Sequence, residues 1–367
     1  MPQSDQMIIG SYNAEDVTFL LKRVRMAPTD ISTKERNIQS GAVHYSEMIS
    51  EERRPDARYL KIFEKARQKS EDRIAREISG LARRIVTRIG NGSLDRHITL
   101  CSLVRAGVPY GVLLQRELSA LGVDSQHFGV SIIRDRGLDR NAIDFILGKH
   151  PAGGVIFVDG WTGKGAISTE LTKSWQEITG RPHVELAVLA DPSGFASMAG
   201  SHEDWLIPSG ILGANVSGLI SRSILNRQVI GPDDFHGSVP VDHLADIDIS
   251  LDFVDRITQR MPQYRGGNAI ADPAIDYLAQ LRACARSCIN IVAEMFDIDD
   301  LNRVKPGIAE ATRAVLRRRP KKVIIRSLED PDLAALIHLC QLDHIELFEN
   351  ARLTGPYRAI TLIEKMS

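Results

Sequence analysis

The sequence predicts an α/β fold in which a parallel sheet carries helices on both faces, followed by a smaller C-terminal α/β domain. Between residues 98 and 190, apolar strands alternate with helical segments, as a doubly wound parallel sheet requires. These strands are continuous apolar runs, which are typical of strands buried on both faces. Short glycine-containing turns follow two of them, and ligands bind such sheets at the carboxyl ends of the strands.

We expect four parts along the chain. Residues 1–56 form an N-terminal extension with a short helix over residues 14–24, and residues 57–265 form the main domain. Apolar residues recur at helical spacing from 57 to 89 until Gly90-Asn-Gly92 ends the run. Glycine and polar residues cluster near residue 265, so residues 266–302 are expected to be a helical linker and residues 303–367 the second domain.

Composition narrows the class of protein. The 367 residues are 43% hydrophobic and 25% charged, with a formal net charge of -1, so no overall field recruits nucleic acid or a membrane. No apolar run has the length of a membrane span, and no signal peptide begins the chain. The four cysteines lack zinc or disulfide spacing, so we expect a cytoplasmic protein.

The run from Val155 to Ala166 carries the strongest functional signal. An apolar strand ends at Asp159, and a turn with Thr162, Gly163 and Gly165 opens a helix, so backbone N–H groups converge as a phosphate site requires. The spacing fits neither a Walker A loop nor a dinucleotide fingerprint. A tight turn whose glycines serve only backbone geometry is the alternative.

Two further segments follow neighbouring strands. The strand 98–104 leads into Arg105 and Gly107, where a guanidinium could meet a pyrophosphate, although an ordinary turn with a surface arginine is the alternative. The strand 129–133 leads into a charged stretch with Arg134 and Arg136, which are either clamps on a leaving pyrophosphate or solvated loop charges.

This arrangement resembles the type I phosphoribosyltransferases, which implies a ribose-phosphate site and catalytic roles for Asp159, Arg105, Arg134 and Arg136. The implied ribose-phosphate ligands are Asp159, Gly160, Trp161, Thr162, Gly163, Lys164 and Gly165, and the implied pyrophosphate ligands are Arg105, Ala106 and Gly107. The second acid of the family motif is missing, because Gly160 stands there. The resemblance further implies magnesium, bound through the substrate pyrophosphate and Asp159.

A closer resemblance covers residues 7–265. Its motifs are Gly10-Ser-Tyr, Ile38-Gln-Ser-Gly41, His44-Tyr-Ser-Glu-Met48, the 132–137 and 158–165 segments, and Ile207-Pro-Ser-Gly-Ile-Leu212. Together they resemble the bacterial phosphoribosyltransferase-like family encoded in tellurite-resistance and stress-response gene clusters, members of which are also labelled StiP cysteine protease. A protease would need a thiolate beside a base, for which Cys101 and His44 are the candidates, but Cys101 falls in a core strand.

Two regions remain. Residues 191–226 stand where the resemblance implies a base-binding hood, with Trp205 and Ser217 as candidate contacts, and Trp205 filling the core is the alternative. Residues 303–367 resemble the Pelota/ribosomal L7Ae-type RNA-binding domain. Basic residues there could contact an RNA backbone or be ordinary solvated charges: Arg317, Arg318, Arg319, Lys321, Lys322 and Arg358.

These resemblances lead us to expect an enzyme that transfers a phosphoribosyl group from phosphoribosyl diphosphate, with a C-terminal RNA-binding module. A non-catalytic nucleotide sensor acting on RNA is the first alternative, and a cysteine protease is the second. Expected partners are phosphoribosyl diphosphate or a nucleotide, and RNA, with no membrane. A homodimer stands open beside a monomer.

Overall fold

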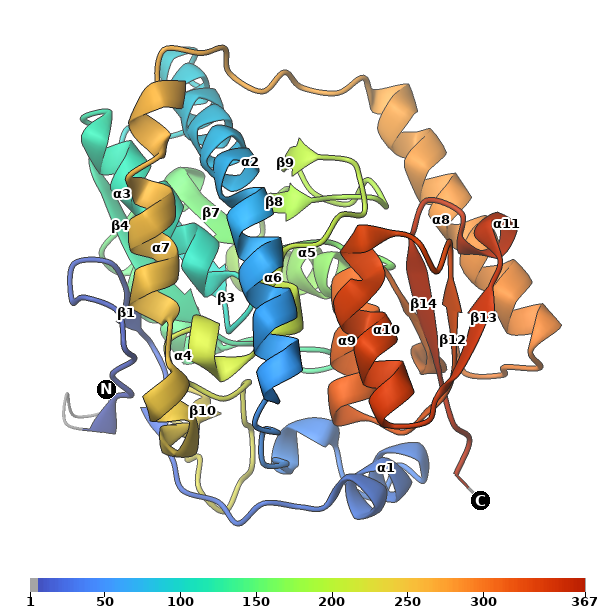
Figure 1. Cartoon of the computed structure of the whole chain (residues 1–367). Helices are drawn as coiled ribbons and strands as arrows, with labels where there is room; N and C mark the ends of the chain where they lie inside the picture. Colours follow the sequence, from blue (N-terminus) through green and yellow to red (C-terminus); the bar gives the residue numbers. More distant parts are fainter. Residues whose placement is uncertain (1–5, 367) are drawn as a thin grey trace.

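The computed structural model describes residues 6–366 and contains two α/β domains that lie side by side (Figure 1). The larger domain is built on a six-stranded sheet and the smaller on a four-stranded sheet. This confirms the predicted fold class, a parallel sheet with helices on both faces and a small C-terminal α/β domain.

The main sheet has the strand order β1-β4-β3-β7-β8-β9, and every neighbouring pair is parallel. Its strands are β1 (Thr18–Phe19), β3 (Ile98–Leu103), β4 (Ser125–Val130), β7 (Val155–Val158), β8 (Glu185–Ala190) and β9 (Met198–Ser201). All six residues of β3 and all four of β7 are buried. Burial on both faces explains why β7 is apolar throughout and why β3 is apolar except for Thr99 and Ser102.

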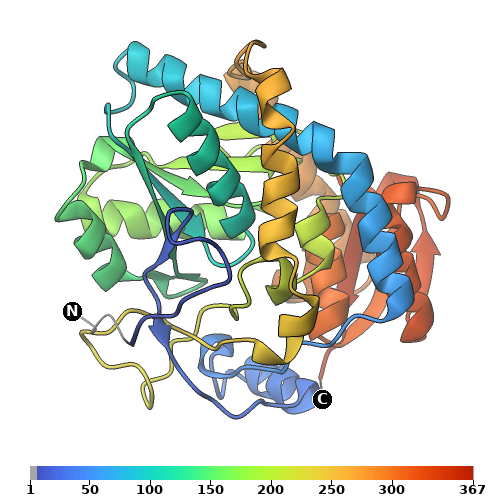
Figure 2. The same ribbon diagram turned by 60° about the vertical axis from the view of Figure 1, so that its left-hand side comes forward.

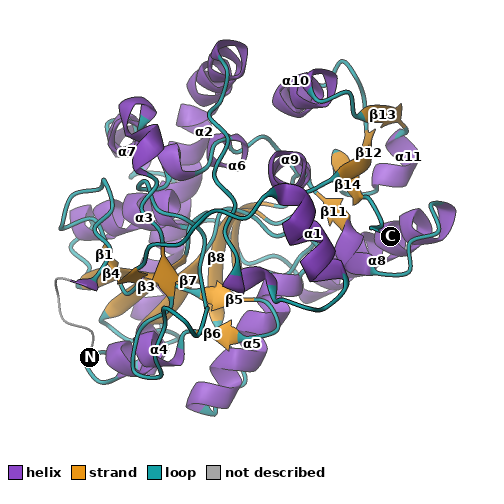
Figure 3. Ribbon diagram, turned by 90° about the horizontal axis from the view of Figure 1, so that it is seen from below, coloured by secondary structure: helices purple, strands orange, loops and turns teal. Residues whose placement is uncertain are grey.

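Helices cover both faces of this sheet (Figure 3). One face carries α2 (Ala57–Gly90), α3 (Val108–Ala120) and α7 (Ser250–Thr258), and the other carries α4 (Arg140–Leu147) and α5 (Ala166–Thr179). The long α2 begins where the Asp56 side chain accepts a hydrogen bond from Tyr59 N at 2.8 Å, and it crosses the whole molecule (Figure 2). It touches both domains, so it holds them in one body.

The N-terminal extension is part of the main domain. β1 adds to the edge of the main sheet, and β2 (Lys22–Arg23) pairs with β10 (Gly237–Ser238), while α1 (Ile31–Gln39) follows further on. The predicted helix over residues 14–24 is therefore wrong. Its Val17-Thr-Phe19 run is β-branched and aromatic, and pairing with β4 outweighs the weak helical pattern.

The C-terminal sheet has the order β11-β14-β12-β13. Its strands are β11 (Val304–Pro306), β12 (Pro320–Ile325), β13 (Glu346–Glu349) and β14 (Ala359–Ile363), and its helices are α9 (Ile308–Arg317), α10 (Ala334–Leu342) and α11 (Ala351–Thr354). The segment predicted as a linker contains α8 (Ile275–Met295), whose buried face packs on this sheet through Ala285, Cys288 and Val292. The connection from α7 to α8 runs over the outside of the molecule (Figure 1).

One carboxylate fastens the two domains at the start of α9. Asp204 is 7% exposed and accepts hydrogen bonds from Ile308 N at 3.1 Å and Arg358 N at 2.7 Å. Both donors belong to the C-terminal domain. The short helix α6 (Pro208–Ile211) also packs on α9, where a Cβ on Gly210 would lie 2.7 Å from that of Ala309.

Candidate functional site

A cleft lies where the carboxyl ends of β3 and β7 face α9 and the N-terminal extension. It consists of two adjoining cavities of about 590 and 380 Å³. Both are lined by the same five cations, and these separate one cavity from the other: Lys34, Arg105, Arg222, Arg313 and Arg317.

The turn after β7 forms one wall of the smaller cavity. Asp159 accepts a hydrogen bond from Gly160 N at 2.8 Å, and burial raises the pKa of its carboxyl to about 6. Within residues 6–366, no group of three or more His, Cys, Asp or Glu residues could hold a metal ion. A single carboxyl with a raised pKa is a poor cation ligand, so these residues do not fit a protein-held magnesium ion.

The same turn is fastened to its surroundings. Thr162 Oγ1 donates to Asp191 and lies 2.8 Å from Ser193 Oγ, and the carbonyl of Gly163 accepts a hydrogen bond from Tyr357 at 3.2 Å. Lys164 Nζ donates to the carbonyls of Leu301 and Val304. The Thr162 and Lys164 side chains, expected to grip a phosphate, are therefore engaged in contacts within the protein, Thr162 in the main domain and Lys164 with the segment around β11.

An acid from α9 also lies against this turn. A Cβ added to Gly163 would stand 2.1 Å from Glu310 Oε2, and Lys305 Nζ lies 3.7 Å from the other oxygen of that carboxylate. A negative side chain thus lies next to the backbone where the sequence suggested a phosphate. Gly165, with a φ of 85°, adopts the left-handed conformation that starts α5.

The turn after β3 is shaped by packing. A Cβ on Gly107 would lie 2.0 Å from the carbonyl oxygen of Val158, so only glycine allows the two strand ends to approach. Arg105 forms an ion pair with Glu52 and donates to the carbonyl of Ile220 at 2.7 Å, while Ala106 lines the smaller cavity. Despite its burial, Glu52 has its carboxyl pKa lowered to about 2 by the Arg105 charge.

The predicted mobile loop is a short hairpin. β5 (Ile132–Ile133) pairs with β6 (Gly137–Leu138), and Arg134 and Arg136 lie at its turn. Arg134 lines the smaller cavity, donates to Asn302 Oδ1 at 3.0 Å and lies over the ring of Tyr45. Arg136 is exposed, and its guanidinium is 3.8 Å from Glu47.

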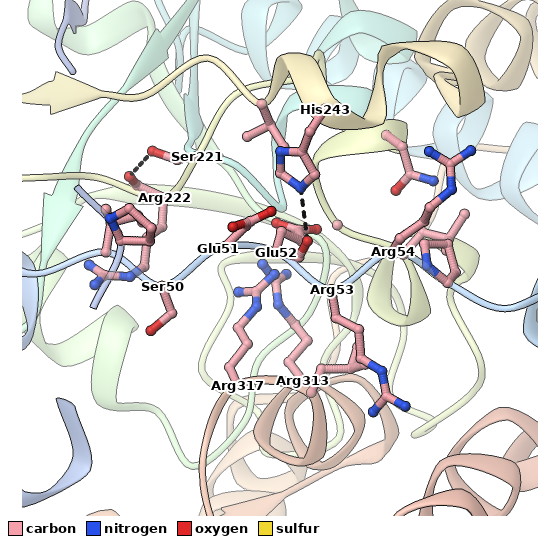
Figure 4. Close-up of a pocket in the computed structure, with 18 of the residues that line it drawn as sticks. Ser50, Glu51, Glu52, Arg53, Arg54, Ser221, Arg222, His243, Arg313 and Arg317 are labelled. Carbon is pink, nitrogen blue, oxygen red and sulfur yellow. Dashed lines mark hydrogen bonds between the residues drawn. The ribbon is translucent and has the colours of Figure 1, made fainter. Parts of the chain in front are cut away.

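Two arginines extend side by side from α9 into the larger cavity, toward Glu51 and Glu52 (Figure 4). Arg313 lies over the ring of Trp161, with 5.3 Å between its guanidinium carbon and the ring centre. Among residues 6–366, neither Arg313 nor Arg317 has a hydrogen-bond or ion-pair partner for its guanidinium. Burial lowers the pKa of Arg313 to about 10 and that of Arg317 well below its ordinary value.

Other candidate residues lie away from the cleft. Trp205 is 4% exposed and belongs to the apolar core, where Arg73 covers its ring at 4.3 Å. Ser217 is buried beside η4, the 3-10 turn Ala214–Val216.

Most of the six basic residues expected to contact RNA form ion pairs within the protein. Arg318 forms an ion pair with Glu35, Arg319 with Glu364 at 3.0 Å, and Lys322 with Glu346 at 2.7 Å. Arg358 pairs with Asp332 at 2.8 Å, Arg317 points into the cleft, and Lys321 is exposed.

None of the cysteines has a histidine partner within residues 6–366. Cys101 is fully buried between β4 and β7, and burial raises the pKa of its thiol. His44 bonds instead to Ser46 at 2.8 Å. Cys288 and Cys340 are also buried, and burial raises the pKa of each thiol to about 12, while Cys284 is exposed.

Sequence reasoning missed the N-terminal contribution to the cleft. Lys34 and Glu52 come from the extension, and nothing in their local sequence marks them as ligands. Burial, reinforced by the charges of Arg222, Arg317 and Arg318, lowers the pKa of Lys34 to about 7. Arg313 lies four residues before Arg317, which was expected to contact RNA, yet its guanidinium faces the cleft (Figure 4).

Fold and cleft together define a two-domain α/β protein with a cation-lined cavity between its domains. The chain belongs to the family described as tellurite-like stress resistance cysteine protease StiP, whose model matches residues 10–258. A model of the PELOTA RNA binding domain matches residues 283–365. The predicted family and its C-terminal Pelota domain are thus confirmed, and the PELOTA match includes most of α8.

A relative and several solved structures are similar to this chain. The protein called cysteine protease StiP from Acinetobacter baylyi is 44% identical over 369 residues, covering 97% of this chain and 94% of that protein. A hypoxanthine phosphoribosyltransferase of Trypanosoma cruzi is 16% identical over 35% of this chain and 77% of its own, with a TM-score of 0.29. The same enzyme in complex with the product IMP is 19% identical over 36% and 72%, also with a TM-score of 0.29.

These comparisons correct the expected function. The prediction of a phosphoribosyltransferase acting on phosphoribosyl diphosphate is wrong, because the family and the full-length relative are both named as cysteine protease. The alternative of a non-catalytic nucleotide sensor is contradicted by the same two names. The partial structural similarities to phosphoribosyltransferases carry no functional argument. The engaged side chains of the 162–164 turn are a physical reason for the error. The names are those of an enzyme, which agrees with the coarser expectation of an enzyme.

Within residues 6–366, no helix is both long and apolar enough to span a membrane.

Proposed function

We propose that this chain is a cysteine protease of stress resistance that carries an RNA-binding C-terminal domain. The observation that supports the protease is the 44% identity to cysteine protease StiP, which extends over 97% of the chain and so includes both domains. Identity at this level over nearly the whole of both proteins favours a shared activity over a shared fold with two different activities.

The proposed protease sets a requirement on the thiols. A cysteine nucleophile acts as a thiolate, which needs a lowered pKa and a nearby base. Cys101, Cys288 and Cys340 are buried and their thiol pKa values are raised, so each would have to become exposed on activation. Cys284 on α8 is the thiol that a reagent reaches without such a change.

Four single Cys→Ser variants and a cysteine-free variant test this proposal on an unfolded protein substrate, with and without iodoacetamide. One single variant should lose cleavage by about 10³-fold or more, and alkylation should abolish the activity of the native protein. Circular dichroism of each variant checks that it folds. Cleavage by the cysteine-free variant at the native rate would end the proposal.

The RNA-binding part is supported by the PELOTA match over residues 283–365. Phosphate contacts by Lys and Arg make RNA affinity fall steeply with salt, by a slope that counts the contacts. Lys321 is exposed on β12, so its ammonium group is available to a backbone phosphate. Fluorescence anisotropy of a labelled single-stranded RNA should give a salt slope that drops by about 0.7 in Lys321→Gln. A native affinity independent of salt would contradict an electrostatic RNA contact.

A further inference from the structure

The five cations that separate the two cavities are far from neutralised by the protein. Arg105 has Glu52 as its partner, and Arg222 donates to the carbonyls of Tyr45 and Met48, which carry no net charge. Lys34 donates to the hydroxyl of Ser50 at 3.2 Å. Arg313 and Arg317 have no partner among the described residues 6–366, although Glu52, Asp159 and Glu310 contribute to the field around Arg313.

This arrangement is costly for the protein alone. Arg313 and Arg317 are four residues apart on α9, so their side chains are neighbours and like charges repel. Burial strengthens the repulsion because less water screens it. The protein keeps them charged and close beside a cavity of about 590 Å³, which is large enough for a small organic molecule.

The side chains that line the larger cavity indicate the chemistry of a molecule that would bind there. Guanidinium groups present planar forks that match phosphate and carboxylate oxygens. The rest of the larger cavity is largely apolar, with Ile31, Ile49, Ile211, Leu212 and Leu339 among its lining. An occupant with a charged end and an apolar body satisfies both parts.

We propose that this cleft binds a small organic molecule with an apolar body and at least two negative charges on phosphate or carboxylate groups. The cations that would hold it come from three parts of the chain: Lys34 from the extension, Arg222 from the main domain, and Arg313 and Arg317 from the C-terminal domain. The site exists only when the two domains are docked. It lies on the larger cavity and does not depend on the proposed protease.

Titration calorimetry on the full chain tests the charged end with three probes: inorganic pyrophosphate, citrate and inorganic phosphate. Pyrophosphate or citrate should bind at least tenfold more tightly than phosphate, and the better of the two tells phosphate from carboxylate chemistry. Arg317→Met should weaken that binding by tenfold or more, while Arg181→Met, which changes an exposed arginine outside the cleft, should leave it unchanged.

A second measurement separates binding from folding. Methionine keeps the apolar stem of the side chain and removes the repelled charge, so Arg317→Met should raise Tm without ligand by about 2 °C. A residue needed only for structure would lower it. Absence of saturable binding of pyrophosphate and citrate up to ~1 mM, or equal affinities in native protein and Arg317→Met, would overturn the proposal.

Discussion

Two pairs of arginines in this molecule share one sequence spacing and meet opposite surroundings. Arg256 and Arg260 are four residues apart, and both reach Glu71 on α2, at 2.9 and 2.8 Å. Arg313 and Arg317 are also four residues apart, but their guanidinium groups extend into a cavity and reach no carboxylate within residues 6–366. Only the first pair is neutralised by the fold.

The difference shows that one arginine pair stabilises the fold and the other is available to a ligand. Glu71 is 1% exposed, and its arginines secure α7 and the turn after it to α2, so this cluster contributes to the stability of the main domain. The Arg313–Arg317 pair does the reverse, because no carboxylate within residues 6–366 forms an ion pair with either guanidinium, and the nearby Glu52 charge offsets their repulsion only in part. The two arginine pairs have the same spacing along the chain. Whether a pair stabilises the fold depends on whether a distant segment supplies a carboxylate, as α2 does through Glu71.

The largest expected loss of stability comes from removing Glu71, the carboxylate that neutralises Arg256 and Arg260. Glu71→Gln removes the buried carboxylate that Arg256 and Arg260 share, which should lower the free energy of unfolding by about 3 kcal/mol. Arg256 then has no ion-pair partner within residues 6–366, while Arg260 keeps Asp72. Urea unfolding measures this. Glu64→Gln on the same helix changes a carboxylate that is 42% exposed and should cost less than about 1 kcal/mol. Equal losses in the two variants would contradict the structural role of Glu71.

The next effect concerns Glu52, the carboxylate that forms an ion pair with the cleft cation Arg105. The pKa of Glu52 is lowered from 4.5 to about 2, so its stabilising effect is full above pH 4.5 and is lost as the pH falls toward 2. Glu52→Gln should therefore lower the free energy of unfolding by about 2 kcal/mol at pH 7. Unfolding curves at several pH values should show this difference shrinking on acidification, and a constant difference would argue against the charge.

Replacing one arginine of each pair by methionine compares the two pairs directly. Arg260→Met removes one of two close partners of Glu71 at a partly exposed site and should lower the free energy of unfolding by about 1 kcal/mol. Arg317→Met should instead raise the free energy of unfolding slightly, because it removes the repulsion between Arg317 and Arg313 and breaks no ion pair within residues 6–366. Both are read from the same urea series. Two losses of the same size would mean that the fold satisfies the two arginine pairs alike.

The smallest effect is that of salt. Screening weakens both attraction in the first pair and repulsion in the second. Raising sodium chloride from about 0.05 to 0.5 M should stabilise native protein relative to Arg317→Met by about 0.5 kcal/mol, and destabilise it relative to Arg260→Met by a similar amount. Opposite signs are the diagnostic outcome, and identical salt responses would remove the distinction between the pairs.

The main elements of the fold could be predicted wherever the local pattern was strong. The strands expected at residues 98–104 and just before Asp159 are observed as Ile98–Leu103 and Val155–Val158, and the long helix expected over residues 57–89 is observed at Ala57–Gly90. β1 and β2 were missed because two-residue strands leave no periodic signal, and β9 because its Met-Ala-Gly-Ser sequence lacks β-branched residues. Their positions depend on pairing with distant strands.

The site could be predicted only in part. The turns after β3 and β7 do line the cleft, because parallel strands bring their carboxyl ends to one edge. The engagement of Lys164 by Leu301 and Val304, and of Arg105 by Glu52, depends on segments more than 50 residues away in sequence. A local motif names a side chain's chemistry but not the partner it meets in the folded chain.

The Asp204 carboxylate has a consequence for how a ligand would arrive. Because it accepts backbone N–H groups from both the start of α9 and the residue before β14, parting the domains would expose several buried polar groups at once. The arginines of α9 are thus held in place before any ligand arrives. Ordering of the cleft adds little to the entropy cost of association, and a ligand enters through the mouth of a preorganised cavity.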